Sequence, residues 1–159
     1  MRKTKEAFKW IINILKKHKI PYRISGGLAA RIYGSKRPLR DIDIEIQDSD
    51  FKDIIPDIKK YIKEGPKNFK DKGMKTYGLV LFYKGQQIEF SGTETEELFD
   101  AKRRKWIKSK IDISKITKKK VYGGIVKVIR KKDLLVYKKM IGSRKEDFDD
   151  IKALLKNRE

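Results

Sequence analysis

The sequence lacks cysteine altogether and has a single histidine, His18. The first absence excludes disulfides and metal sites built on thiolates. No apolar run approaches the length of a membrane span, and the first residues carry no apolar signal-peptide segment, so we expect a cytoplasmic protein without a membrane partner. His18 stands among lysines (Lys16, Lys17 and Lys19), which favours an exposed place at a helix end over a catalytic role.

Acidic residues are also few beside basic ones. The 159 residues include 42 Lys and Arg against 22 Asp and Glu, which gives a formal net charge of +20. A positive field of this size attracts polyanions and speeds their encounter with the protein. It fits a nucleotide substrate or a nucleic acid, and it fits equally a protein kept soluble by charge repulsion. Because 40% of the residues are charged, the composition is also typical of thermophilic proteins.

Hydrophobic periodicity predicts an α+β protein. We expect helices over residues 4–18, 51–63, 93–101, 131–141 and 144–157. Strands are expected over residues 22–25 and 41–46, with hairpins over 76–91 and 120–130. The segments 65–75 and 109–120 are predicted to be irregular. From this order we expect a small mixed sheet with flanking helices over residues 1–92. A C-terminal extension of helix, hairpin and helices over 93–159 should pack on that core or form one domain with it.

Acids and isoleucines alternate over residues 41–46, which read DIDIEI. Alternation with period two predicts a strand whose isoleucines face a core and whose acids share the other face. The Cα atoms of Asp41 and Asp43 then lie about 6.6 Å apart, so their carboxylates can bind one metal ion or bridge two. Oxygen ligands of this kind suit Mg²⁺ or Mn²⁺. An edge strand with a solvated acidic face would show the same alternation.

Two adjacent glycines, Gly26 and Gly27, mark the end of the first predicted strand. A strand that ends in Ser25-Gly26-Gly27 and turns into a helix directs free backbone N–H groups outward, and glycine lets a phosphate approach the backbone. A tight turn with Ser25 as N-cap would by itself explain the glycines. Together with the acid pair, the turn predicts a site for phosphoryl or nucleotidyl transfer.

A basic run, KRRKWIK, surrounds Trp106 at residues 102–108. Such a run is typical of nucleic-acid contacts, in which arginines bind phosphates and the indole stacks on a base. It is more often a solvated helix face whose tryptophan packs inward. The pattern alone favours the second interpretation.

The glycine pair and the acid pair together resemble a known signature. Gly26-Gly27, thirteen intervening residues and then Asp41-Ile42-Asp43-Ile44 is similar to the signature of the polymerase-β-like nucleotidyltransferase superfamily. Within it, residues 24–46 most resemble the small lincosamide-type antibiotic nucleotidyltransferases and the AbiEii-type toxin nucleotidyltransferases. The resemblance implies the nucleotidyltransferase fold, an NTP as donor substrate, and Mg²⁺ or Mn²⁺ as cofactor.

The resemblance also implies a third carboxylate. The superfamily carries it on a strand like that predicted over residues 86–91, where this chain has Glu89. Asp41, Asp43 and Glu89 would then form the catalytic metal triad. Glu45, which lies one further pleat along its strand, is the competing candidate for the third ligand.

Nucleotide-binding residues follow from the same resemblance. Ser25, Gly26 and Gly27 would hold the phosphates through a hydroxyl and backbone N–H groups. The C-terminal pattern of the relatives is matched over residues 133–150, and by analogy Lys138 would reach the triphosphate. Lys138 could also be one more surface lysine in a lysine-rich chain.

We therefore expect an enzyme that moves an NMP from an NTP to an acceptor hydroxyl and releases pyrophosphate. The acceptor would be a small molecule, an RNA or tRNA end, or a protein side chain. The alternative is a nucleotidyltransferase scaffold with weak or lost catalysis. Such a scaffold would bind nucleic acid, or would act as the toxin of a pair neutralised by an acidic protein partner.

Overall fold

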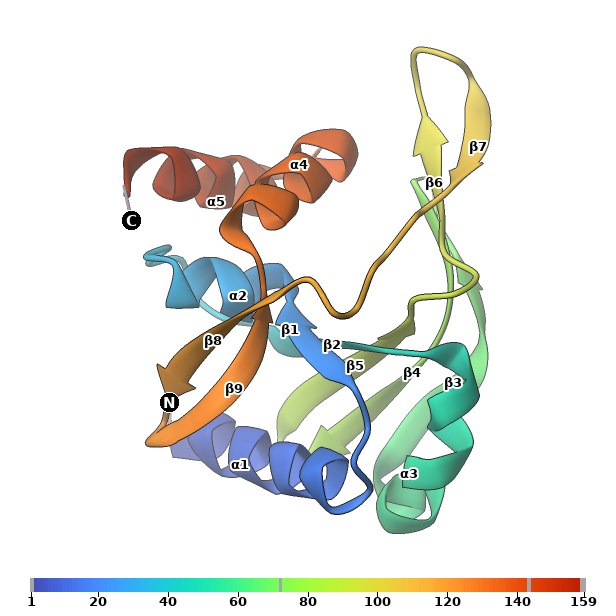
Figure 1. The fold of residues 1–159 in the computed structure, drawn as a ribbon, viewed down its shortest axis with the longest axis vertical. Helices are drawn as coiled ribbons and strands as arrows, with labels where there is room; N and C mark the ends of the chain where they lie inside the picture. The colour runs from blue at the N-terminus through green and yellow to red at the C-terminus, as the bar shows by residue number, and fades with distance from the viewer. Residues whose placement is uncertain (1, 72, 143, 158–159) are drawn as a thin grey trace.

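One mixed β-sheet organises the chain, and helices lie on both of its sides (Figure 1). The structure is a computed structural model that describes residues 2–71, 73–142 and 144–157. Its helices are α1 (Arg2–Lys17), α2 (Gly26–Ile32), α3 (Phe51–Ile58), α4 (Lys131–Ile141) and α5 (Lys145–Lys156), with 3₁₀ turns at Asp48–Asp50 and Lys59–Tyr61. Its strands are β1 (Tyr22–Ser25), β2 (Asp41–Ile46), β3 (Ile62–Lys70), β4 (Met74–Tyr83), β5 (Gln86–Gly92), β6 (Glu97–Asp100), β7 (Lys105–Lys108), β8 (Ile116–Val121) and β9 (Gly124–Ile129). No described helix is both long and apolar enough to span a membrane.

The strands follow the order β7-β6-β4-β5-β2-β1-β9-β8, and β3 pairs with β4 off this path. Two pairs are parallel, β2 with β5 and β1 with β9, and the others are antiparallel. Strands from residues 97–129 therefore extend the sheet at both ends, on either side of the central strands β5, β2 and β1. This arrangement confirms the predicted α+β class with a mixed sheet.

The alternation of β2 separates its two faces as predicted. Ile42, Ile44 and Ile46 are fully buried. They belong to a core that includes Phe8 of α1 and Phe51 of α3, and these two helices cover this side of the sheet (Figure 1). Burial of each such side chain contributes roughly 1.5–3 kcal/mol. The isoleucine face thus anchors the strand and leaves the acids on the face toward α2, α4 and α5.

The predictions for residues 51–75 were wrong in part. The helix ends at Ile58, and the segment expected to be an irregular loop instead forms β3 and the start of β4. Gly65 and Pro66 lie within β3, where its register against β4 shifts. A register shift tolerates a proline that lacks an N–H, and pairing with β4 supplies the partners that the isolated segment lacks.

The helix predicted from Thr93 is also absent, because residues 97–108 form the hairpin β6–β7. The N–H of Thr93 donates to the carbonyl of Ile46, and the carboxylate of Glu96 accepts from Ser109 Oγ at 2.9 Å instead of capping a helix. Phe99 and Trp106 pack against each other across the hairpin, with ring centroids 5.4 Å apart. Thr93 followed three residues later by Glu96 is typical of a helix start, but bonds to other segments override this local pattern. The basic run becomes the hairpin's turn and second strand.

The C-terminal elements match the prediction more closely. The second hairpin joins β8 to β9 through Tyr122 and Gly123, although β8 begins at Ile116, inside the segment expected to be irregular. α4 and α5 follow over nearly the predicted ranges. Of the predicted link Gly142-Ser143, Ser143 lies outside the described residues. The two helices stand over the acid-bearing side of the sheet, beside the hairpin β6–β7 (Figure 1).

Candidate active site

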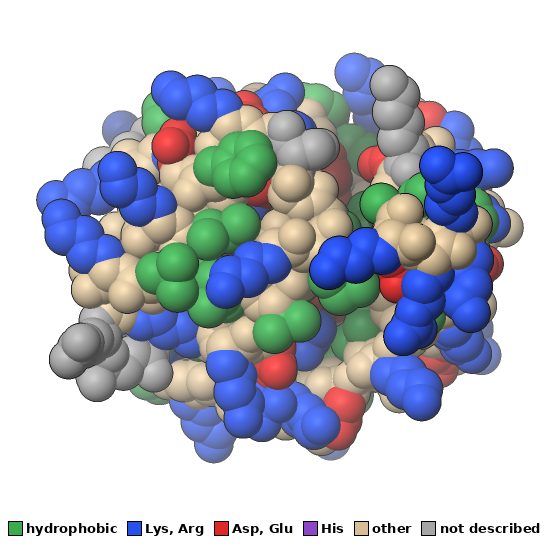
Figure 2. Space-filling view, turned by 90° about the horizontal axis from the view of Figure 1, so that it is seen from above, with side chains coloured by type: hydrophobic (Ala, Val, Ile, Leu, Met, Phe, Trp, Pro, Cys, Tyr) green, Lys and Arg blue, Asp and Glu red, His purple; other side chains and the backbone are tan. Residues whose placement is uncertain are grey.

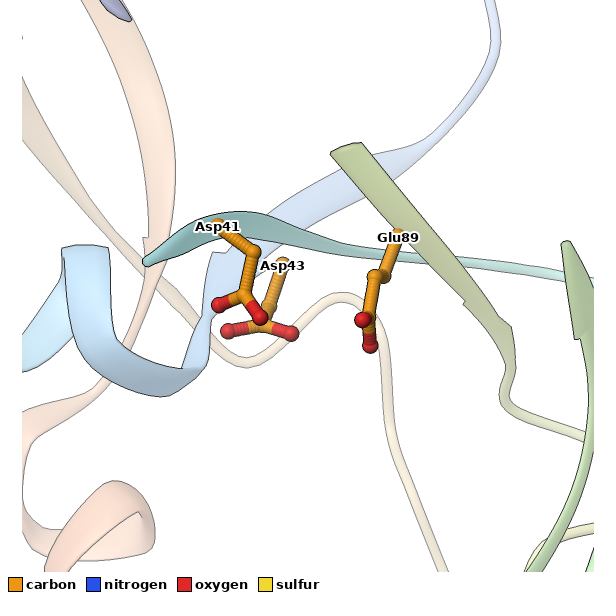
Figure 3. A group of neighbouring side chains, drawn as sticks. All are labelled: Asp41, Asp43 and Glu89. Atoms are coloured by element: carbon orange, nitrogen blue, oxygen red, sulfur yellow. The ribbon is translucent and has the colours of Figure 1, made fainter. Parts of the chain in front are cut away.

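Three carboxylates meet where β2 runs beside β5. Asp43 is paired in register with Glu89, and Asp41 lies two residues earlier on the same face of β2. Asp41, Asp43 and Glu89 each direct a carboxylate oxygen into the same space, and these oxygens all lie within 4.8 Å of one another (Figure 3). The structure therefore brings together the three acids that the sequence and the resemblance selected.

The glycine turn lies directly against this cluster. Ser25 ends β1 in register with Asp43, and Gly26 follows with a left-handed φ of +58°. A Cβ at Gly26 would lie only 1.9 Å from Asp43 Oδ2, so neither the conformation nor the space admits a side chain. The N–H of Gly27 donates to the same oxygen at 3.4 Å. The backbone at the start of α2 is thus in contact with the acid cluster.

The acids repel one another strongly. Burial and the charges of Asp41 and Glu89 raise the pKa of Asp43 to about 8. Burial and Asp41 also raise the pKa of Glu89, against the opposing effect of Gln87, whose Nε2 donates to Glu89 Oε1 at 2.5 Å. Without a cation, this cluster therefore retains a proton near neutral pH.

Such a donor set fits a hard divalent cation. The three acids offer only oxygen ligands. Because they lie close together and repel one another, a cation between them would stabilise their charged forms. These are the properties expected of a Mg²⁺ or Mn²⁺ site that shares its remaining positions with phosphate oxygens.

Glu45, the rival third ligand, does not join the cluster. It lies on the same face of β2, where it is buried in an ion pair with Arg23 of β1. Because the arginine already neutralises this carboxylate, Glu89 is the better candidate, as we predicted.

Lys138 is buried in the layer above the sheet. Its Nζ lies 3.2 Å from Asp147 Oδ1 and 2.9 Å from Asp150 Oδ2, so it joins α4 to α5. Its charge also lowers the pKa of Asp43, which brings Lys138 into the electrostatic surroundings of the site. A role for Lys138 in binding nucleotide stays a prediction.

Arg37 is a site residue that the sequence reasoning missed. Its Nη2 lies 2.4 Å from the position that a Cβ of Gly27 would occupy, so the guanidinium rests against the glycine turn. Its Nε pairs with Asp150 at 2.9 Å, which fixes the side chain there. Arg37 is one of 42 basic residues. The one signal that could have singled it out is its position between the glycine turn and the aspartate pair.

Several solved structures resemble nearly the whole chain. TM1012 of Thermotoga maritima, a presumed nucleotidyltransferase, matches with a TM-score of 0.72 and 17% identity over 96% of this chain and 92% of its own. The lincomycin-bound lincosamide antibiotic adenylyltransferase LnuA matches with 0.64 and 13% identity over 96% and 97% of the two chains. ANT(2″)-Ia in complex with adenylyl-2″-tobramycin matches with 0.60 and 9% identity over 95% and 87%.

No family model matches the sequence, and no curated protein matches it significantly. The similarity to these solved structures is therefore one of fold, and it confirms the predicted nucleotidyltransferase fold.

Proposed function

We propose that this protein is a metal-dependent nucleotidyltransferase, which moves an NMP from an NTP to an acceptor hydroxyl. The observation that carries the proposal is the meeting of three carboxylates within 4.8 Å, against a glycine turn, in a fold shared with nucleotidyltransferases. Simple binding of a polyanion gives no reason to gather three acids in a chain of net charge +20.

Asp41, Asp43 and Glu89 would hold the cation, with Mg²⁺ or Mn²⁺ as the ions that suit their oxygens. When bound, such an ion supplies Lewis-acid stabilisation of the charge that develops on the phosphates. The raised pKa of Asp43 supports this assignment, because a carboxyl that burial and two neighbouring acids keep protonated gains most from a cation.

The chain's own groups position the donor. Ser25, Gly26 and Gly27 would present a hydroxyl and backbone N–H groups to the NTP phosphates, and the missing Cβ at Gly26 leaves room for the carboxylate of Asp43 against the turn. Arg37 beside the turn adds a positive charge, and Lys138 is our further candidate for attracting the triphosphate. Positioning and electrostatic stabilisation of this kind supply most of the rate in phosphoryl chemistry.

Glu89 is the candidate general base. It lies on the strand beside the aspartate pair, so its carboxylate is placed to accept the proton of an acceptor hydroxyl. As the acceptor hydroxyl gives its proton to Glu89, its oxygen forms a bond to the α-phosphorus. The bond from that phosphorus to the bridging oxygen breaks, and pyrophosphate leaves with the electron pair.

The test is transfer of label from an α-³²P-labelled NTP. The protein is incubated with each NTP and Mg²⁺ or Mn²⁺, with lincomycin, tobramycin, total RNA or total protein as acceptor. We expect metal-dependent labelling of one acceptor class, and loss of that labelling in the double variant Asp41→Asn/Asp43→Asn. Asp53→Asn/Asp149→Asn is the matched control, because it makes the same change of charge at exposed positions on α3 and α5. Labelling that survives in the first double variant would disprove the proposal.

A further inference from the structure

A pocket lies on the acid-bearing face of the sheet, two residues along β1 and β2 from the candidate active site. The pair Ser25–Asp43 belongs to the site, and the next pair that faces the same way is Arg23–Glu45. Residues two apart on a strand lie roughly 6.6 Å apart. Arg23 and Glu45 line this pocket of about 330 Å³, so part of its wall lies two residues along β1 and β2 from the pair Ser25–Asp43.

The walls of this pocket, which we call the side pocket, are largely apolar. α4 contributes Val136, Tyr137 and Met140, and the opposite wall carries Leu98 and Ile107 of the hairpin β6–β7. Val136 and Met140 are 60% and 54% exposed, although both are apolar. Large apolar side chains left open inside a concave site are typical of a surface that a ligand covers.

The acids that line the side pocket already have partners. Glu45 pairs with Arg23, Asp133 pairs with Arg130, and Asp112 accepts hydrogen bonds from Ser114 in its own loop. Arginines thus neutralise two of the three carboxylates, and the third is hydrogen-bonded within its own loop.

The lysines at the rim of the side pocket have no carboxylate partner of this kind among the described residues. Lys108, Lys110 and Lys115 line the side pocket and are exposed. Within the part of the chain that the structure describes, none of the three forms an ion pair. Lys and Arg also crowd the surface around apolar patches on the side of the molecule shown in Figure 2. The side pocket thus combines apolar walls with a rim of exposed lysines that form no ion pair with any residue that the structure describes.

We infer that the side pocket binds the acceptor, and that this acceptor is a small molecule with an apolar body and an anionic group. That the ligand is the acceptor rests on the proposed function. Its apolar body and anionic group are inferred from the residues that line the pocket. The volume lies at the lower end of the range for small-molecule sites, which favours a small ligand over a folded nucleic acid. Charge complementarity favours the anionic group, because three exposed lysines at the rim attract it while arginines neutralise two of the three acids that line the pocket.

Two fluorescent probes that differ in one group test the chemistry of the side pocket. 8-Anilino-1-naphthalenesulfonate has an apolar body with a sulfonate, and N-phenyl-1-naphthylamine has the same body without it. We expect one saturable site, with the sulfonate probe bound at least about tenfold more tightly at low salt and the difference reduced at high salt. Equal affinity for the two probes would overturn the inference.

Variants of exposed residues locate the probe. Val136→Asp and Met140→Asp place an acid in the side pocket and should weaken sulfonate binding at least about tenfold. Ile125→Asp is the matched control, since Ile125 is 55% exposed on β9 and does not line the pocket. Unchanged binding in Val136→Asp, or equal loss in Ile125→Asp, would show that the probe binds elsewhere and would overturn the assignment.

A second set of variants separates charge from apolar contact. In Lys108→Gln/Lys110→Gln/Lys115→Gln, affinity for the sulfonate probe should fall to that of the neutral probe, whose own affinity should not change. The control triple Lys118→Gln/Lys120→Gln/Lys139→Gln removes the same charge at exposed positions outside the side pocket. Equal loss in both triples would assign the effect to net charge and would contradict a built anion site.

Failure of this inference and failure of the proposed function give different results. At least one of the four NTPs with Mg²⁺ should raise the melting temperature of the wild type but not of Asp41→Asn/Asp43→Asn, whether or not the sulfonate probe is bound. If an NTP with Mg²⁺ stabilises the protein but the probes do not discriminate, only the side pocket is wrong. If the probes behave as expected and none of the four NTPs stabilises the protein, nucleotidyl transfer is wrong. An RNA 3′ end that displaces the probe and accepts label would replace the small molecule with a polynucleotide.

Discussion

The two faces of β2 place opposite demands on the same six residues. The isoleucine face is fully buried against α1 and α3 and supplies stability. The acid face gathers Asp41 and Asp43 beside Glu89, where burial and like charges raise the pKa of two of the three acids. Stability on one face thus holds in place a cluster that is unfavourable by itself, which is typical of a functional site and not of a structural one.

Removal of one acid should have the largest effect on function. In Asp43→Asn we expect label transfer to fall at least about a thousandfold, because a ligand of the cation is lost. Stability without metal should stay equal or rise at pH 8, since the substitution removes repulsion from Asp41 and Glu89. Label transfer and urea unfolding measure the two quantities. A stability loss as large as the loss of function would show that the acid face is structural.

Truncation on the opposite face should give the reverse pattern. Ile44→Ala removes part of a fully buried side chain and should lower the free energy of unfolding by about 3 kcal/mol in urea. Transfer per folded molecule should change less than about threefold, because the carboxylates keep their strand. Ile125→Ala, at an exposed position of β9, is the control and should stay within about 0.5 kcal/mol of the wild type. Equal loss of stability in both variants would contradict the claim that the buried isoleucine face of β2 stabilises the fold.

The smallest expected effect is a pH dependence of stability that a metal suppresses. Between pH 3.8 and about 8, folded Asp43 retains a proton that the unfolded chain has released. The free energy of unfolding should therefore fall as pH rises through this window. Mg²⁺ should reduce this fall by taking the place of the proton.

Chemical unfolding at pH 5 and pH 8, with and without Mg²⁺, measures this effect. Glu96, whose pKa burial raises to about 7, contributes a slope of the same sign. The difference between the wild type and Asp43→Asn isolates the part due to Asp43. Equal slopes in these two proteins would contradict a raised pKa at Asp43.

The site was predictable from sequence to the extent that its residues are local. The spacing from Gly26 to Asp43 lies within a single β1–α2–β2 unit, and period-two alternation assigns each side chain to a face. Glu89 needed the resemblance, because alternation alone does not say which strand lies beside β2. Arg37 was missed, since its place depends on an ion pair with Asp150, more than a hundred residues away.

The parts of the fold that sequence reasoning missed depend on pairing between distant segments. Thr93 and Glu96 satisfy a local capping pattern, yet Thr93 bonds to Ile46 and Glu96 to Ser109. The segment around Gly65 likewise becomes a strand because β4 pairs with it. Local propensity describes such segments only when no tertiary partner competes for their backbone groups.

The sequence by itself determined the glycine turn, the aspartate pair and the isoleucine face behind them, because residues two apart on a strand must share a face whatever surrounds them. Only the tertiary structure decided that Glu89 lies beside Asp43, that Arg23 neutralises Glu45, and that α4 and the hairpin β6–β7 enclose a pocket. Those contacts depend on which strands become neighbours, and strand order is set by packing of the whole chain.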